Sequence, residues 1–232
     1  MSAFQEVLSS YFEYYLKDLM TAIPAIVVAN DRLDESIIAV KPAINERTLD
    51  GRVYPWPEVV DVPLVFPCSL TSAVTFPVNV GDTVLLVFSM RGLDGWKTGD
   101  GGLANPTDRR THAIQDAVAI PGLYPMGRSR NNPNARNLPH STNDLVFSHN
   151  IGTGAEAEVR IKPSGQIEIT SPIKIVVNSP ETEWNGNISL NGNLTQVGTY
   201  SIAGQFVYNG EEYSLHTHIG VQPGSGTTGP KA

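Results

Sequence analysis

The apolar positions at the start of the chain follow a helical period. From about Ala3 to Met20 they recur every three or four residues, which is the spacing of one face of an amphipathic helix. The stripe is made of Phe4, Val7, Leu8, Tyr11, Phe12, Tyr15, Leu16, Leu19 and Met20. Because the stripe is wide and rich in aromatic residues, we expect this N-terminal helix (residues 1–22) either to cover the domain that follows or to dock on a partner subunit.

The pattern changes to short β-like runs between residues 23 and 126. These runs are rich in β-branched residues and are bounded by Pro, Gly, Asn or Asp, as strands usually are. The predicted strands are residues 25–29, 36–40, 62–66, 73–76, 83–88 and 117–120. This number of strands in so short a segment is typical of a small closed barrel, and an OB-fold-like barrel is the simplest interpretation.

Residues 127–142 interrupt these patterns. The segment is polar, rich in Asn and Pro, and nearly free of large apolar side chains. Such a composition predicts a solvated linker between two differently built domains.

The alternation of apolar and polar residues becomes strict beyond the linker, in residues 143–212. One parity is apolar over almost twenty positions: Val159, Ile161, Ile167, Ile169, Ile173, Ile175 and Val177. After Trp184 the expected strands become very short and are separated by Asn-Gly pairs. Short strands with one narrow apolar face cannot build a core alone, so we expect three copies to wind around a shared axis as an intertwined triple-stranded β-helix. The predicted fold class is therefore all-β, with the N-terminal helix added.

The last segment, residues 213–232, contains His216 and His218. Two residues apart on a strand, both imidazoles leave the same face, and the even parity of Ile202 and Phe206 continues into them. Imidazole is a common metal ligand, but two nitrogens do not complete a coordination shell. Three chains on a three-fold axis would give six nitrogens, which suit Fe(II), Ni(II) or Co(II) better than Zn(II). The alternative is two solvated histidines on a strand.

Other residues offer few further metal ligands. His112, His140 and His149 lie in or beside polar loops, and Cys68 lies in an apolar run far upstream. A single cysteine also excludes an intrachain disulfide framework.

The net charge and the lengths of the apolar runs limit which kinds of partner we expect. The formal net charge is −7, which argues against nucleic acid as a partner, and we expect none. No apolar run approaches the length of a membrane span, and charged residues interrupt the N-terminal pattern, unlike a signal peptide. We expect a soluble protein made in the cytosol.

The C-terminal segment carries a resemblance to a known family. Residues 215–230, LHTHIGVQPGSGTTGP, resemble the C-terminal tip of the central spike proteins of contractile-tailed phages, the baseplate assembly protein V and membrane-piercing spike family. The order of an N-terminal barrel, a linker, a β-helical shaft, His-x-His and a Gly/Thr-rich end is also similar, so the resemblance covers nearly the whole chain. The N-terminal helix has no counterpart in it.

This resemblance implies a structural role in a virion. The protein would be a homotrimer at the tip of the phage tail baseplate, beneath the tail tube, with its barrels against the baseplate hub. Its shaft would pierce the host outer membrane as the sheath contracts, and His216 and His218 of three chains would hold one Fe ion per trimer. Contraction supplies the energy, so the resemblance implies no catalytic residue and no enzyme activity.

Two alternatives remain from other functional classes. Gly210 followed by His216 and His218 resembles the start of the metal motif of a cupin-type metalloenzyme. The expected Glu is absent from residues 220–223, however, and the fourteen residues after His218 would be too few for the rest of that barrel. A glycan-binding trimeric tail fibre would need exposed aromatic residues along the shaft, where Trp184 and Tyr200 offer thin support.

Overall fold

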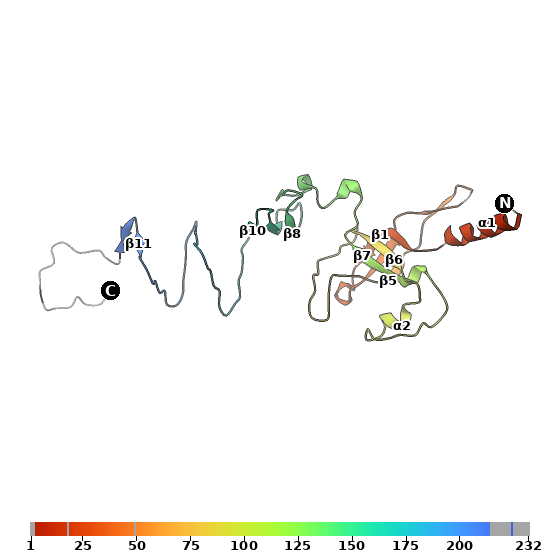
Figure 1. Cartoon of the computed structure of the whole chain (residues 1–232), viewed down its shortest axis with the longest axis horizontal. Helices are drawn as coiled ribbons and strands as arrows, with labels where there is room; N and C mark the ends of the chain where they lie inside the picture. Colours follow the sequence, from red (N-terminus) through yellow and green to blue (C-terminus); the bar gives the residue numbers. More distant parts are fainter. Residues whose placement is uncertain (1–2, 18, 49, 214–223, 225–232) are drawn as a thin grey trace. The chain divides into compact units, whose positions relative to one another are not determined.

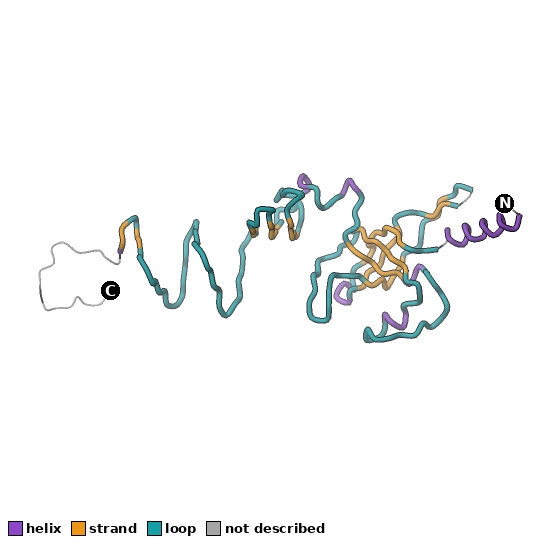
Figure 2. The backbone as a smooth tube through the Cα atoms, viewed as in Figure 1, coloured by secondary structure: helices purple, strands orange, loops and turns teal. Residues whose placement is uncertain are grey.

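The computed structural model describes residues 3–17, 19–48, 50–213 and 224. The chain divides into two units, Met1–Lys174 and Ile175–Ala232. Figure 1 labels the main elements, and Figure 2 colours the helices purple and the strands orange. The fold is mostly β, as the sequence predicts.

The largest element is a five-stranded sheet with the order β5-β2-β1-β6-β7. All neighbouring strands are antiparallel. Their bounds are β1 Ala22–Ala29, β2 Ile37–Pro42, β5 Val59–Pro63, β6 Thr83–Phe88 and β7 Ala117–Pro121. The two edges approach each other where Leu64 forms a parallel bridge with Ala119 and the Val65 N–H donates to the Ala119 carbonyl at 2.8 Å. The sheet is therefore a curled half-barrel (Figure 1). The prediction of a barrel is confirmed in its general form, but not as a closed OB-fold-like barrel.

The inside of this curled sheet is the apolar core of the first unit. Along β6 every second residue is buried, because successive side chains of a strand point to opposite faces. The largest fully buried side chains include Leu86, Val27, Val40, Val62 and Val84, which come from four different strands. The strands, which are rich in β-branched residues, therefore pack their buried side chains into one core.

The predicted strand at residues 73–76 is wrong. The segment makes only an isolated bridge between Cys68 and Ala73, and Phe76 stands edge-on to Phe66 with ring centroids 5.2 Å apart. Pro67 and Pro77 flank the region, and proline has no N–H to donate to a ladder. Aromatic packing replaces strand pairing here.

Other parts of the barrel segment also differ from the prediction. The strand expected at 62–66 lies earlier, at 59–63. A small hairpin of β3 Glu46–Arg47 and β4 Val53–Tyr54 was not predicted, because two-residue strands carry no readable period. Short helices also occur between the strands: η1 Leu33–Glu35, α2 Asp94–Lys97 and η2 Ile114–Asp116.

The N-terminal helix α1 spans Ala3–Lys17, and Leu19 and Met20, which were expected to be helical, are not. The side chains of its apolar stripe are exposed, from 43% at Leu8 to 74% at Phe4. Within α1 the chain therefore leaves the stripe uncovered, whereas Met20, the last residue of the stripe, packs against the core of the curled sheet.

A second, smaller sheet follows the linker. It contains β8 Leu145–His149, β9 Ala157–Ile161 and β10 Ile167–Thr170 in the antiparallel order β10-β9-β8. The linker itself contains two short 3₁₀ turns, η3 Met126–Arg128 and η4 Pro133–Ala135. The sequence did not predict that residues 145–170 pair within one chain.

The described part of the second unit has little strand pairing of its own. Within residues 175–213, the described strands are β11 Val207–Tyr208 and β12 Glu211–Glu212, joined by Asn209 and Gly210. Both linking residues have positive φ, 51° and 83°, as a tight two-residue hairpin turn requires. The preceding stretch appears as unpaired chain in Figure 2. The triple-stranded β-helix needs other chains and stays a prediction.

Candidate functional site

One face of the small sheet of β8, β9 and β10 is mainly apolar, with His149 and Ala157 paired at its end. Leu145 and Ile167 both lie opposite Ile161, and Phe147 and Ile169 both lie opposite Val159. Because residues that pair across strands point to the same side, these six side chains form two apolar rows on one face. We call this surface the apolar face.

The apolar face is largely open to solvent. Leu145 is 56% exposed, Phe147 57%, Ile167 63% and Ile169 57%. Monomeric proteins rarely leave a contiguous apolar patch of this kind uncovered, and such patches usually mark an interaction surface. The geometry therefore makes the apolar face the candidate functional site.

The opposite side of the same sheet is charged and ordered by ion pairs. We call it the charged face; its members include Glu158, Arg160, Lys162 and Glu168. Arg160 pairs with Glu158 and lies 3.7 Å from Glu168, while the Lys162 ammonium is 2.6 Å from Glu168. Glu158 is only 5% exposed, whereas the side chains of Lys162 and Glu168 are 32% and 35% exposed, so the charged face is buried at Glu158 and partly open beside it.

The linker covers this charged face. The Asn137 N–H donates to a Glu156 carboxylate oxygen at 2.8 Å, and Arg136 donates to the Ser148 hydroxyl at 2.6 Å. Arg160 donates to the Pro139 carbonyl at 3.1 Å. The Arg136 side chain is 7% exposed, so this part of the predicted solvated linker is packed against the sheet, and that prediction is wrong here.

Glu156 makes the central contact between the linker and the small sheet. Burial disfavours its charge, but the N–H groups of Gly152 and Asn137 and the charge of Arg136 outweigh this cost and lower the pKa of its carboxyl. Glu156 is therefore an ionised buried anchor that joins the linker to the sheet.

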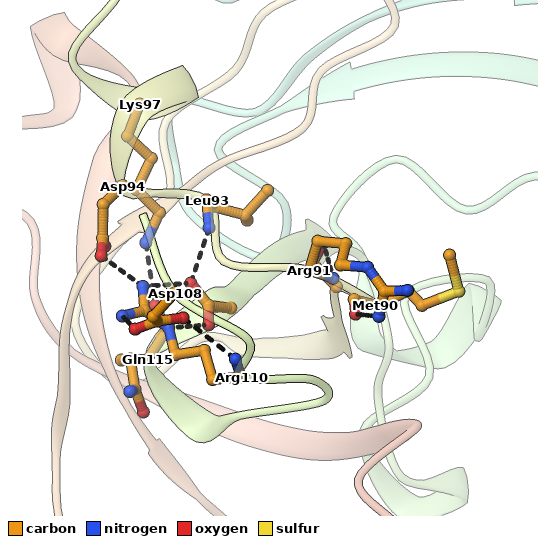
Figure 3. A network of polar contacts seen from close by, with 10 residues as sticks. Met90, Arg91, Leu93, Asp94, Lys97, Asp108, Arg110 and Gln115 are labelled. Carbon is orange, nitrogen blue, oxygen red and sulfur yellow. Dashed lines mark hydrogen bonds and ion pairs between the residues drawn. The ribbon is translucent and has the colours of Figure 1, made fainter. Parts of the chain in front are cut away.

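A second buried ion pair anchors the loop of residues 91–112 to the barrel (Figure 3). Arg110 donates through Nε to Asp116 at 2.6 Å and through a terminal nitrogen to Asp108 at 2.9 Å, and it also contacts Asp94. Asp116 is fully buried and accepts the Leu93 N–H at 2.8 Å. One buried carboxylate thereby fixes both ends of the loop.

The ionisation of this cluster follows from its contacts. The hydrogen bond from Arg110 lowers the pKa of Asp116, and hydrogen bonds to Asp116 and Asp94 raise the pKa of Arg110. Burial lowers the pKa of Lys97, whose ammonium donates to the Gln115 carbonyl at 3.0 Å. The Arg110 guanidinium thus pairs with three carboxylates of the loop and its anchor, which indicates a structural role.

The predicted metal ligands His216 and His218 lie outside the described residues. Of the other histidines, His112 contacts the Met20 carbonyl through Nδ1 at 3.0 Å, His140 is buried, and His149 ends β8. Over the described ranges, no group of three or more His, Cys, Asp or Glu side chains could hold a metal ion. No helix in the described part of the chain is long and apolar enough to cross a membrane.

The alternation in the sequence signalled both faces of the small sheet, but not the linker that covers part of the charged face. The parity of Val159, Ile161, Ile167 and Ile169 predicts one shared face, and the register confirms it. Alternation does not reveal that Arg136 and Glu156 would meet, because contacts between distant segments leave no local pattern.

Comparison with known proteins identifies one part of the chain. The family model of the phage protein Gp138 N-terminal domain matches residues 23–122, which contain the five strands of the curled sheet apart from Ala22, the first residue of β1. No curated protein matches the chain. Residues 23–122 are thus similar to a domain of phage proteins. This similarity supports the prediction that the chain is a phage protein, but it does not identify the spike family.

Proposed function

We propose that this protein is the structural central spike of a contractile phage tail baseplate, a homotrimeric needle that pierces the host outer membrane. The observation that carries the proposal is the reversed burial of the small sheet. Its charged face is covered by its own linker, and its apolar face is left open. A surface of this kind is stable in water only when another apolar surface covers it.

Other copies of the same chain are the best cover for the apolar face. The apolar parity continues in the sequence through Ile173, Ile175 and Val177, which are 84%, 58% and 67% exposed. A narrow apolar strip repeated along a chain is buried when identical strips face a common axis. Three copies would enclose this axis, with the charged faces and linkers outside.

The similarity of the barrel segment to a phage protein domain indicates where the protein would act. The match of residues 23–122 to a phage protein domain supports a location in the virion. In the proposed spike, three barrels form a collar that meets the baseplate hub and tail tube proteins. Arg110 and Asp116 fasten the long loop to each barrel, so that the collar transmits force without deforming.

His216 and His218 are proposed to hold one iron ion at the tip. Two imidazole nitrogens from one chain do not complete a coordination shell, so the proposed site takes its histidines from three chains. Six imidazole nitrogens fit an octahedral ion such as Fe(II). The ion would link the three chain ends at the tip, where too few apolar side chains would line the shared axis to hold the chains together.

The mechanism requires rigidity and no catalysis. The contracting sheath pushes the trimer, the collar passes the force to the shaft, and the shaft concentrates it on the tip. Apolar contacts along the axis resist bending of the shaft, and the metal resists separation of the chain ends.

The test combines molar mass with metal content on one sample. The full-length, tag-free protein is measured by light scattering and by elemental analysis, beside the double variant His216→Ala/His218→Ala and the control His149→Ala. We expect a trimer with one iron per three chains, no iron in the double variant, and unchanged iron in the control. One metal ion per chain in a monomer or dimer would contradict the proposal and favour an enzyme site.

A further inference from the structure

We propose that the α1 helices of three copies pack together as a parallel three-helix bundle. This inference rests on the proposed trimer and goes beyond it, because α1 lies outside the segment that matches the phage domain.

The spacing of the stripe suits a bundle. Phe4, Leu8, Tyr11 and Tyr15 follow the alternating steps of four, three and four residues that place side chains along the seam between parallel helices. On the opposite side of the helix lies Glu6, which stays in solvent in this arrangement.

The stripe is also wide. Val7 and Phe12 flank the seam, at 69% and 56% exposure, and extend the apolar surface on both sides. A seam of two helices buries only a narrow strip, whereas a helix in a bundle of three or more buries a broader face. The width therefore favours three helices over two.

The helix needs such a cover to be stable. It has 15 residues, and an isolated helix of this length is marginal in water. Its own chain leaves the stripe exposed, from Phe4 at one end to Leu16 at the other. A trimer joined elsewhere would hold three such helices at a high local concentration, which makes their association effectively intramolecular.

The charges of α1 favour other copies over a lipid surface. The helix carries Glu6 and Glu13 but only one basic residue, Lys17. Helices that bind anionic membranes carry several Lys or Arg residues on their polar face. In a bundle, by contrast, identical apolar stripes cover one another and the acidic residue opposite the seam remains hydrated.

Cysteine cross-linking of the full-length chain tests the bundle directly. The exposed free thiol of Cys68 is first removed by Cys68→Ser. Leu8→Cys then places one thiol per chain in the seam, and the matched control Glu6→Cys places it on the opposite side. Under mild oxidation, we expect Leu8→Cys to form disulfide-linked dimers at least tenfold faster than Glu6→Cys, with up to two thirds of the chains linked.

The outcomes separate this inference from the proposed function. If light scattering gives a trimer but the two cysteine variants cross-link at the same rate, the bundle is wrong and the trimer stands. If light scattering gives a monomer, both are wrong. Flotation of the trimer with phosphatidylglycerol vesicles, lost in Leu8→Asp but not in Ser9→Asp, would also overturn the bundle by showing that lipid covers the stripe.

Discussion

The two sheets of the first unit bury opposite kinds of side chain. The curled sheet of β1, β2, β5, β6 and β7 keeps its apolar residues inside, with Leu86 and Val84 fully buried. The sheet of β8, β9 and β10 buries Glu156 and Glu158 and exposes Phe147. Both sheets have alternating strands, so alternation alone does not decide which face is covered.

The difference lies in how each sheet can be closed. The five-stranded sheet curls until Leu64 meets Ala119, so that its apolar face is covered by the same sheet. Three short strands are too few to curl around a core of their own. Their chain instead covers part of the charged side and leaves the apolar side exposed, which is the side that the proposed trimer would bury.

Breaking the apolar face should have the largest effect. In Phe147→Asp, each chain loses about 2 kcal/mol of apolar burial, so three chains lose about 6 kcal/mol per trimer, before the cost of the buried charge is added. We expect light scattering to show dissociation at micromolar concentration. The control Leu103→Asp changes an exposed apolar residue of the surface loop and should leave the mass unchanged. A variant at position 147 that stays fully trimeric would show that the apolar face is not the interface.

Damage to the barrel core should act differently, without changing assembly. Leu86→Ala leaves a cavity among β-strands that are already packed, and we expect the free energy of unfolding to fall by about 3 kcal/mol. The loss should not depend on protein concentration, because the core lies within one chain. Denaturant unfolding at two concentrations measures this, with the exposed Val60→Ala as control. A concentration-dependent loss would place Leu86 at an interface.

The sequence predicted elements with a strong local period well. The run at residues 83–88 is strand β6 as predicted, and the predicted helix differs from α1 mainly at its end. The segment at 73–76 failed because its flanking prolines and the Phe66–Phe76 contact override its β-propensity. Local preference decides an element only where the neighbouring chain permits pairing.

The candidate site was predictable in part. One apolar parity along β9 and β10 predicts a shared face, and the register confirms it. The ion pairs of Arg110 with Asp116 and of Arg136 with Glu156 were not predictable, since each depends on how the whole chain folds back. The iron site at His216 and His218 stays a prediction.

The buried anchor of the barrel loop should have an intermediate effect. Asp116→Asn keeps an acceptor for the Leu93 N–H but removes the charge that faces Arg110, so we expect a loss of about 2 kcal/mol in the free energy of unfolding at neutral pH. Denaturant unfolding measures the loss, and Asp108→Asn, on the exposed side of Arg110, should cost much less.

The same variant predicts a pH dependence. Because the folded state lowers the pKa of Asp116, its ionised form stabilises the protein above the ordinary aspartate pKa of about 3.9, and this stability is lost as the pH falls through the lower folded value. The difference between the native protein and Asp116→Asn should therefore shrink below about pH 4. A difference that stays constant down to pH 2 would show that Asp116 contributes through shape and not through charge.

The smallest effect is expected at the cover of the charged face. Gly152 has φ of 77°, and an added Cβ would lie 3.0 Å from the Ala135 carbonyl oxygen. Gly152→Ala should therefore strain the turn that donates to Glu156 and cost about 1 kcal/mol. Gly154→Ala is the matched control, since a Cβ there meets nothing within 4 Å and its φ is not in the left-handed region. Hydrogen exchange of the Asn137 amide, which Glu156 holds, should accelerate several-fold in Gly152→Ala while the trimer mass is unchanged. If the mass also fell, the cover and the apolar face would depend on each other, and the two faces of the sheet could not be treated as separate surfaces.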